Sequence, residues 1–170
     1  MVIEPLDPAS PLPPANGHAN EGPLPSNVHQ MAATKLAAVA QRYTANRRAV
    51  VDALLALPGP ATIAEVLETG NGLAQSSTYR NLVVLERVGV VHRIVTSDDH
   101  ARYELTEDIT GQHHHHLICD HCGLIIDVFL DPELEHALEA SLGRAAAANR
   151  FHGQHHRVDL VGLCHGCQDN

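Results

Sequence analysis

Hydrophobic residues recur at helical spacing through the first half of the chain, and this spacing predicts a run of helices. Thr44 and Thr62 suit the N-cap positions of two of them, because a side-chain hydroxyl accepts a hydrogen bond from a free backbone N–H. Pro58 lacks a backbone donor and ends the longer helix, while Gly89 suits the position after the last one. The predicted helices cover residues 29–43, 45–57, 63–68 and 78–88, with Ser76 or Ser77 opening the last.

The pattern then changes to two short runs of β type, residues 90–95 and 101–105, joined by a polar turn. Helices followed by such a hairpin are typical of a winged helix-turn-helix domain. In that fold the helix at residues 78–88 enters the major groove of DNA and the hairpin forms the wing. We therefore expect a DNA-binding domain over residues 29–105.

The last third of the chain combines β-type runs with one long helix. Asp131 and Pro132 form a good start for this helix, whose apolar face would carry Leu134, Leu138 and Leu142. The predicted elements are strands at residues 115–119, 124–129 and 158–163 and a helix at residues 131–147. An exposed strand of each protomer would pair across a two-fold axis, which predicts a homodimer on a palindromic DNA site.

These elements predict an α+β fold class, with a winged-helix domain followed by a small α/β dimerisation domain over residues 112–170. Residues 106–111 would be the hinge. Residues 1–28 hold seven of the ten prolines and no apolar periodicity, so we expect a disordered tail. The chain has no run of eighteen apolar residues and no recognisable export signal, which predicts a cytoplasmic protein without a membrane partner.

Charge is distributed unevenly. The formal net charge is −9, which for the whole chain argues against nucleic-acid binding. Residues 31–105, however, carry eight basic and seven acidic side chains, whereas residues 106–170 carry three arginines and ten carboxylates. Only the middle third is therefore suited to approach phosphates, and the acidic last third suits cations. Aromatic residues make up 3% and Trp is absent, so both cores must be built mainly from aliphatic side chains.

All four cysteines lie in two Cys-x-x-Cys units, Cys119 with Cys122 and Cys164 with Cys167. Two turns that each present two thiolates are typical of a closed tetrahedral zinc site. The alternatives are a pair of disulfides or separate buried thiols, but in a reducing cytoplasm metal is favoured. Four sulfur ligands leave no open position, so the predicted zinc is structural.

Four consecutive histidines precede the first of these units. In an extended segment alternate side chains face opposite sides, so His114 and His116 would serve one site and His113 and His115 another. One short strand would then contribute to two further metal sites. The alternative is a set of solvated polar residues on an acidic surface.

Several motifs in this order resemble the ferric uptake regulator family. Single pieces such as Thr-Tyr-Arg are weak, but the series covers about residues 31–168. The resemblance implies a metal-loaded dimer that represses metal-homeostasis genes, and zinc uptake regulators are the branch most similar to this chain. The motifs are Arg42-Tyr43-Thr44-Ala45-Asn46-Arg47-Arg48, Ser77-Thr78-Tyr79-Arg80-Asn81-Leu82, Leu85-Glu86-Arg87-Val88-Gly89, Tyr103-Glu104-Leu105, the His-rich Cys-x-x-Cys-Gly and Gly162-Leu163-Cys164-His165-Gly166-Cys167.

The resemblance also implies roles for individual residues. Family members contact DNA through the Tyr and Arg that here are Tyr79 and Arg80. Contacts to the DNA backbone would come from Ser77 and Thr78, since hydroxyls and free N–H groups at a helix start bind phosphate. The guanidinium of Arg47 would add another. The alternative is that these are ordinary surface residues of a helix.

The regulatory metal of the family lies between the two domains. Here its ligands would be His92, Glu104, His114, His116 and Asp127, with Asp108 or His100 as substitutes on the wing side. A second regulatory site would hold His113, His115, Glu135 and His156, with Glu133 and His155 as close rivals.

This chain departs from its relatives at two ligand positions. The cysteine usual in zinc sensors after the wing is absent, and Gly59-Pro60-Ala61 replaces the histidine of iron and peroxide sensors. Histidine and carboxylate ligands suit Zn²⁺, while Fe²⁺ or Mn²⁺ would take more oxygen ligands. We therefore favour zinc, with iron, manganese or peroxide sensing as the alternative.

Two other functional classes would also use metal-binding residues. A metalloenzyme would need an open metal site beside a general base, and the sequence contains no His-Glu-x-x-His or nucleophile motif, so we expect no enzyme activity. A metal-storage protein would use the histidines but would not need the Ser77-Thr78-Tyr79-Arg80 segment.

Overall fold

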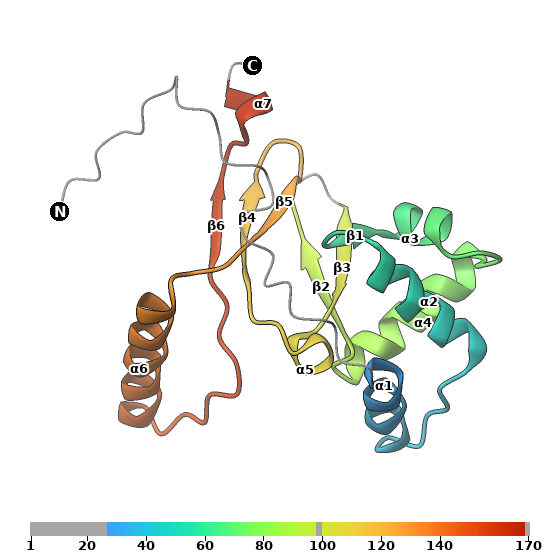
Figure 1. Ribbon diagram of the computed structural model, residues 1–170, viewed down its shortest axis with the longest axis horizontal. Helices are drawn as coiled ribbons and strands as arrows, with labels where there is room; N and C mark the ends of the chain where they lie inside the picture. Colours follow the sequence, from blue (N-terminus) through green and yellow to red (C-terminus); the bar gives the residue numbers. More distant parts are fainter. Residues whose placement is uncertain (1–26, 98–99, 169–170) are drawn as a thin grey trace.

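The computed structural model describes residues 27–97 and 100–168. The predicted tail at residues 1–28 therefore lies almost entirely outside the described residues. The elements form two groups, a helical half with a small sheet and a second half built on another sheet (Figure 1). This α+β arrangement is the fold class expected from the sequence.

The first half contains four helices packed beside a three-stranded sheet. Its strand order is β1-β3-β2, and both pairings are antiparallel. The elements are α1 (Val28–Ala37), α2 (Ala45–Ala56), β1 (Ala61–Thr62), α3 (Ile63–Thr69), α4 (Gln75–Arg87), β2 (Val91–Val95) and β3 (Ala101–Leu105). The strands β2 and β3 form the predicted wing hairpin.

Threonine caps start two of the helices as expected. The Thr44 hydroxyl accepts from the Arg47 N–H at the start of α2. Thr62 and Glu65 form a reciprocal capping box at the start of α3. The prediction for α4 was wrong by three residues, because Ala74 is the N-cap and both serines lie inside the helix. The first helix was also predicted too long, since α1 ends at Ala37.

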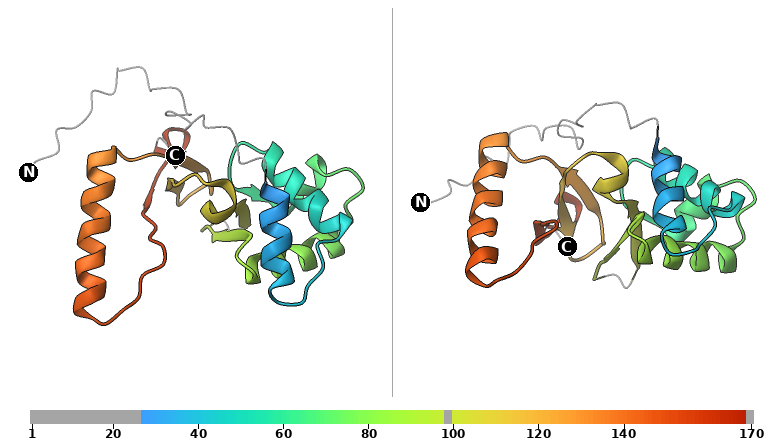
Figure 2. Two further views of the ribbon diagram at one scale, coloured as in Figure 1. Left: turned by 60° about the horizontal axis from the view of Figure 1, so that its bottom comes forward. Right: turned by 90° about the horizontal axis from the view of Figure 1, so that it is seen from below.

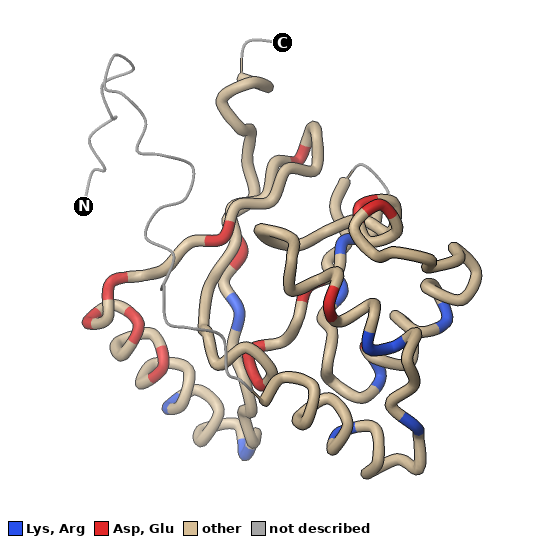
Figure 3. Tube along the Cα trace, turned by 45° about the vertical axis from the view of Figure 1, so that its right-hand side comes forward, with Lys and Arg blue, Asp and Glu red and all other residues tan. Residues whose placement is uncertain are grey.

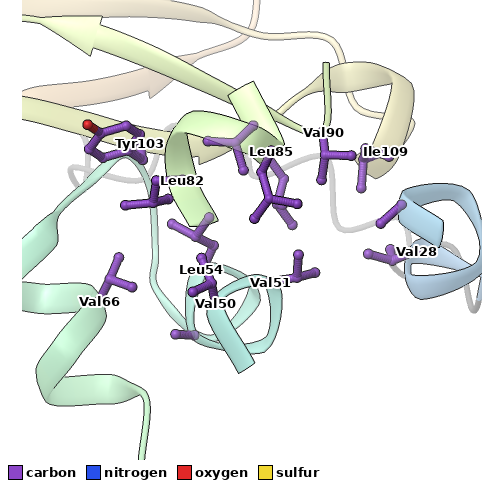
Figure 4. Close-up of a cluster of buried hydrophobic side chains, with 14 of the residues drawn as sticks. Val28, Val50, Val51, Leu54, Val66, Leu82, Leu85, Val90, Tyr103 and Ile109 are labelled. Atoms are coloured by element: carbon purple, nitrogen blue, oxygen red, sulfur yellow. The ribbon is translucent and has the colours of Figure 1, made fainter. Parts of the chain in front are cut away.

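The core of this half is aliphatic, as the composition predicted. Leu82 and Leu85 on α4 pack with Val50 and Val51 on α2, and Tyr103 is the largest side chain enclosed among them (Figure 4). Ile109, which follows the wing, is completely buried in the same cluster. The core therefore extends beyond the predicted domain end at Leu105.

The second half is a sheet of order β5-β4-β6 with one long helix. Strand β4 pairs antiparallel with β5 and parallel with β6. Its elements are β4 (His115–Cys119), β5 (Ile125–Val128), α6 (Pro132–Ala148), β6 (Asp159–Gly162) and α7 (His165–Gln168). Asp131 caps α6 as predicted, with its carboxylate accepting from the Glu133 N–H.

Helix α6 stands away from the sheet in every view (Figures 1 and 2). None of its residues is buried, and Leu134 is 55% exposed. The residues that the structure describes therefore leave the predicted apolar face of Leu134, Leu138 and Leu142 without a buried position.

A single helical turn, α5 (Glu107–Thr110), occupies the segment that was expected to be a hinge. It ends at Gly111, whose left-handed backbone (φ 68°) suits glycine.

Candidate metal centres

The four cysteines meet at one end of the second sheet. Their sulfur atoms all lie within 4.8 Å of one another, and Cys122 Sγ is 3.7 Å from Cys164 Sγ. A tetrahedral zinc ion with Zn–S bonds of 2.3 Å separates its sulfurs by about 3.8 Å. All four are free thiols, so the disulfide alternative does not apply to this structure and the geometry suits zinc.

The electrostatics of this sulfur cluster also fit a cation. The backbone N–H groups of Cys164 and Cys122 lower the pKa of the Cys119 thiol to about 6. Hydrogen bonding with Cys164, together with burial, raises the pKa of Cys167 to about 12. One thiolate is thus stabilised, but further thiolates repel it unless a cation is bound among them.

A second group of ligands lies between the two halves of the chain and is called the interdomain cluster below. It consists of Glu104 on β3, His114 and His116 at the start of β4, and Asp127 on β5, with ligand atoms within 4.8 Å of one another. Glu104 Oε2 lies 3.2 Å from His114 Nε2 and 3.3 Å from His116 Nε2.

Neighbouring strands of the second sheet fix the positions of His116 and Asp127, while His114 directly precedes β4. His116 and Asp127 are cross-strand partners of β4 and β5, with Nε2 and Oδ1 3.8 Å apart. The other ring nitrogen of His116, Nδ1, lies 3.2 Å from Asp159 Oδ1 on β6. A carboxylate behind a ligating imidazole fixes its ring so that Nε2 faces the metal.

The third cluster uses the opposite face of the histidine run. Glu135 Oε2 is 2.9 Å from His115 Nε2, and Glu135 Oε1 is 2.7 Å from His156 Nε2 and 3.1 Å from His113 Nε2. Burial acts to raise the pKa of Glu135, but the hydrogen bond from His115 and the charges of the nearby histidines outweigh it and lower the pKa. Of the rival ligands, Glu133 and His155 are exposed and lie outside this group.

Several buried atoms of these clusters approach one another without hydrogen-bond geometry. In the described part of the chain, the buried side-chain atoms without a hydrogen-bond partner include Asp127 Oδ1, His113 Nε2, Glu135 Oε1 and His156 Nε2. Buried polar atoms are normally paired. Atoms that converge without pairing fit ligands arranged around a cation, so both histidine clusters suit a metal ion.

His92 lies beside the interdomain cluster but outside the group of four. It faces Glu104 across the wing hairpin, yet its Nε2 accepts a hydrogen bond from Arg157 Nη1. The same guanidinium donates to Asp159 Oδ2 at 2.8 Å. The structure leaves His92 outside the group of four, with Arg157 at its Nε2, so its role as a metal ligand stays a prediction. The substitute Asp108 pairs with Lys35 instead.

Sequence reasoning missed three residues that support these clusters: Asp159, Arg157 and Glu107. Asp159 is the parallel strand partner of His116, so only the order of strands in the sheet reveals it. Glu107 lies in the expected hinge, where its Oε1 is 2.7 Å from His113 Nδ1. No spacing in the sequence indicates the contact of Asp159 with His116 or that of Glu107 with His113.

The predicted DNA-binding residues divide into exposed and enclosed ones. Tyr79 is 54% exposed and Arg80 is exposed on the same turn of α4. Thr78 is completely buried and donates to the Ala74 carbonyl. The expectation for Thr78 was wrong, because a side chain enclosed in the core does not reach a phosphate.

Two further DNA-binding candidates already have partners within the chain. The Ser77 hydroxyl donates to the Ala74 carbonyl at 2.9 Å. Arg47 donates through Nη1 to the Arg42 carbonyl and through Nη2 to Gln41 Oε1 at 3.0 Å. Figure 3 shows most Lys and Arg positions in the half that carries α4, with acidic residues along the first turns of α6.

The pH dependence of the metal-free protein follows from the interdomain cluster. The hydrogen bond with Glu104 raises the pKa of His114 to about 8, and the two histidines overcome burial to lower the pKa of Glu104 to about 2. The His114 contribution is therefore complete below pH 6.5 and is lost as pH rises through about 8. We expect the free energy of unfolding of chelated protein to fall by up to about 2 kcal/mol between pH 6.5 and 9.

Metal binding should show the opposite trend, because the cation displaces the His114 proton and binds more tightly as pH rises over this range. Thermal unfolding of chelated protein at each pH measures the first trend, and proton release on metal addition measures the second. A His114→Gln variant is the control, and it should lose most of the fall in stability. Equal stability of the chelated wild type at pH 6.5 and 9 would contradict the assignment.

Among the residues that the structure describes, no helix is both long and apolar enough to cross a membrane.

Comparisons with known proteins agree with the geometry. Residues 39–161 match the model of the ferric uptake regulator family. A peroxide-responsive repressor, PerR, of Staphylococcus saprophyticus is 30% identical over 132 residues, which cover 75% of this chain and 83% of that protein.

Solved structures of similar fold include the Helicobacter pylori ferric uptake regulator Fur and a zinc-bound manganese uptake regulator. The first has a TM-score of 0.63 at 24% identity and covers 85% of this chain and 93% of that one. The second has a TM-score of 0.54 at 26% identity, with coverages of 81% and 98%.

Proposed function

This chain belongs to the ferric uptake regulator family, and from that premise we propose that it represses metal-uptake genes when Zn²⁺ occupies the interdomain cluster. Members of the family are metal-responsive transcriptional regulators and not enzymes. The observation that carries the proposal is the position of Glu104, which reaches from the wing to His114 and His116 of the second sheet. The ligands of the interdomain cluster therefore come from both halves of the chain.

The mechanism is linkage between metal binding and domain orientation. Glu104 belongs to the DNA-binding half, whereas His114, His116 and Asp127 belong to the sheet that would join two protomers. A bound cation supplies positive charge that offsets the two partly buried carboxylates, Glu104 and Asp127, and holds these side chains together. The metal-bound form thereby favours one orientation of the two halves, and DNA binding and metal binding strengthen each other.

The ligands of the interdomain cluster favour zinc as the sensed metal, with iron or manganese as the second candidate. Two imidazoles and two carboxylates complete a tetrahedral zinc site. The two carboxylates, Glu104 and Asp127, are also hard oxygen donors of the kind that Fe²⁺ and Mn²⁺ prefer, and His92 is engaged by Arg157. Sensing of iron, manganese or peroxide is therefore the second candidate. For the sulfur cluster we propose a structural Zn²⁺.

A homodimer is proposed from the uncovered apolar surface of the second half. Leu134 on α6 is 55% exposed, Leu160 on β6 is 66% exposed, and Phe151 between them is 70% exposed. Large apolar side chains that are this exposed favour an interface with another protein surface. Strand β6 is at the edge of its sheet, so a second copy of the chain can pair with this strand and cover the exposed apolar side chains. Two α4 helices related by a two-fold axis would then contact a palindromic operator.

The deciding experiment identifies the metal that switches on DNA binding. A duplex is first selected in vitro with protein loaded with each metal in turn, and its affinity is then titrated at fixed salt and buffered free Zn²⁺, Fe²⁺ or Mn²⁺. Zinc should activate DNA binding at a lower free concentration than Fe²⁺ or Mn²⁺, so that a range of concentrations exists in which only zinc is active. Activation by Fe²⁺ or Mn²⁺ alone would select the second candidate, and DNA binding that ignores all three metals would refute the function.

Arg80 and Tyr79 on α4 are proposed to contact the operator. Replacing Arg80 by alanine should weaken binding to the selected duplex by about tenfold and leave the melting temperature unchanged, since Arg80 is exposed. Fluorescence anisotropy at fixed salt measures the affinity. Arg144→Ala on α6 is the matched control and should bind like the wild type. If Arg80→Ala also binds like the wild type, Arg80 is not in the DNA contact.

A further inference from the structure

Helix α5 is an extension of the DNA-binding half and not a free linker. The Thr106 N–H donates to the Val90 carbonyl at 3.1 Å, and the Thr106 hydroxyl donates to the Gly89 carbonyl at 2.9 Å. Ile109 is fully buried in the core of that half. Asp108 also forms a 2.8 Å ion pair with Lys35 on α1. These contacts make the turn part of the winged-helix domain, and Gly111 is the first residue beyond it.

Glu107 on this turn is directed to the other half of the protein. Its Oε1 lies 2.7 Å from His113 Nδ1, while Nε2 of the same imidazole lies 3.1 Å from Glu135 Oε1. The side chains of His113 and Glu107 are about one-third exposed. One ring thus joins a carboxylate of the winged-helix domain to the third cluster.

Apart from this contact, the third cluster is confined to the second half. His113, His115, Glu135 and His156 all follow Gly111 in the chain, so a cation bound by these four alone would have no ligand from the DNA-binding half. With Glu107 behind His113, the ring is held with Nδ1–H donating to the carboxylate and Nε2 toward the other ligands. Such a carboxylate fixes the tautomer and orientation of a ligating imidazole.

We infer that Glu107 is a positioning residue for the third cluster and couples the occupancy of that cluster to the orientation of the winged-helix domain. The inference deepens the proposed function and rests on it. A cation bound at His113 Nε2 strengthens the His113–Glu107 contact, because it draws electron density from the ring and makes Nδ1–H a stronger donor to the carboxylate. The docked position of α5 in turn raises the affinity of the cluster for the cation, since coupling is reciprocal.

The test uses zinc as the probe in the full chain carrying His114→Ala, which disables the interdomain cluster. Zinc is titrated against a competing chelator in this background, with and without Glu107→Gln. The carboxamide keeps the size of the side chain but removes its charge. We expect Glu107→Gln to weaken zinc binding at the third cluster about 10-fold to 100-fold, the range typical of carboxylates behind metal ligands. Asp108→Asn, which breaks only the Lys35 pair, should leave that affinity unchanged.

Hydrogen exchange provides a readout that a purely structural role would not change. In the His114→Ala background, zinc should slow exchange of the backbone amides of residues 107–113, and Glu107→Gln should abolish this protection. Thermal unfolding of the metal-free variants checks that α5 still folds. Glu107→Asp is an independent variant that keeps the charge but shortens the side chain, which withdraws the carboxylate from His113 Nδ1.

The possible outcomes separate the inference from the proposed function. Wild-type zinc affinity and wild-type protection in both Glu107 variants would overturn the role of Glu107. If zinc binding is weaker but the amides of residues 107–113 stay protected, the coupling to the winged-helix domain would be wrong. Glu107 would then only position His113. Neither readout uses DNA, so a protein whose DNA binding ignores metal would refute the proposed function without changing these two results.

Discussion

Replacing Glu104 by glutamine is expected to abolish metal-dependent DNA binding while leaving both domains folded. Glu104 Oε2 contacts His114 and His116 together, and only 13% of its side chain is exposed. Among the residues that the structure describes, Glu104 is the one member of the interdomain cluster from the DNA-binding half, and loss of its charge removes that ligand. Metal affinity at this cluster should fall more than about 100-fold, beyond the effect usual for a group behind the ligands. Titration with buffered metal, followed by anisotropy on the selected duplex, measures both losses.

Glu68→Gln on α3 is a suitable control because Glu68 is exposed and lies outside the metal clusters. It should retain wild-type metal affinity and DNA binding. A Glu104→Gln protein that still binds the duplex in a metal-dependent manner would show that the cation is held by the second half alone. The linkage mechanism would then be wrong.

Replacing Cys119 by serine is expected to remove one zinc ion per protomer and to destabilise the second half. Cys119 is buried, and its sulfur accepts from the Cys164 N–H at 3.3 Å, so it joins the two Cys-x-x-Cys turns. A structural zinc site contributes directly to folding. We expect a loss on the order of 3 kcal/mol in the free energy of unfolding, which corresponds to a fall of roughly 10 °C or more in melting temperature.

Elemental analysis and thermal unfolding measure these two effects, and His121→Gln is the matched control. His121 lies between Cys119 and Cys122 and is exposed, so its loss should leave zinc content and melting temperature unchanged. Full zinc content in the Cys119→Ser protein would contradict a four-sulfur site.

The periodicity of the sequence predicted much of the architecture and the grouping of the metal ligands. Two-residue alternation in the histidine run assigned His114 and His116 to one face and His113 and His115 to the other, and the clusters in the structure have this composition. The wing hairpin and the Asp131 cap also follow from local patterns. Each of these depends on residues close together in the chain.

Features that depend on packing between distant segments were not predictable in this way. The completely buried Thr78 was expected at the DNA surface, because the sequence does not show that α4 begins at Gln75 and turns this residue inward. Arg157 comes from a loop sixty-five residues after His92, and no pattern indicates that it would occupy the His92 nitrogen. Ile109 anchors a segment that was expected to be a hinge. The sequence does not reveal this, because a single apolar residue carries no periodicity.

In the proposed mechanism, one cation holds the DNA-binding half against the second half. Crystals of the protein loaded with zinc, measured on both sides of the zinc absorption edge, test it most directly. We expect an anomalous peak at about 2.0–2.2 Å from an oxygen of Glu104 and from one nitrogen each of His114 and His116. An ion bound to these histidines while Glu104 points away, or no peak at this place, would contradict it.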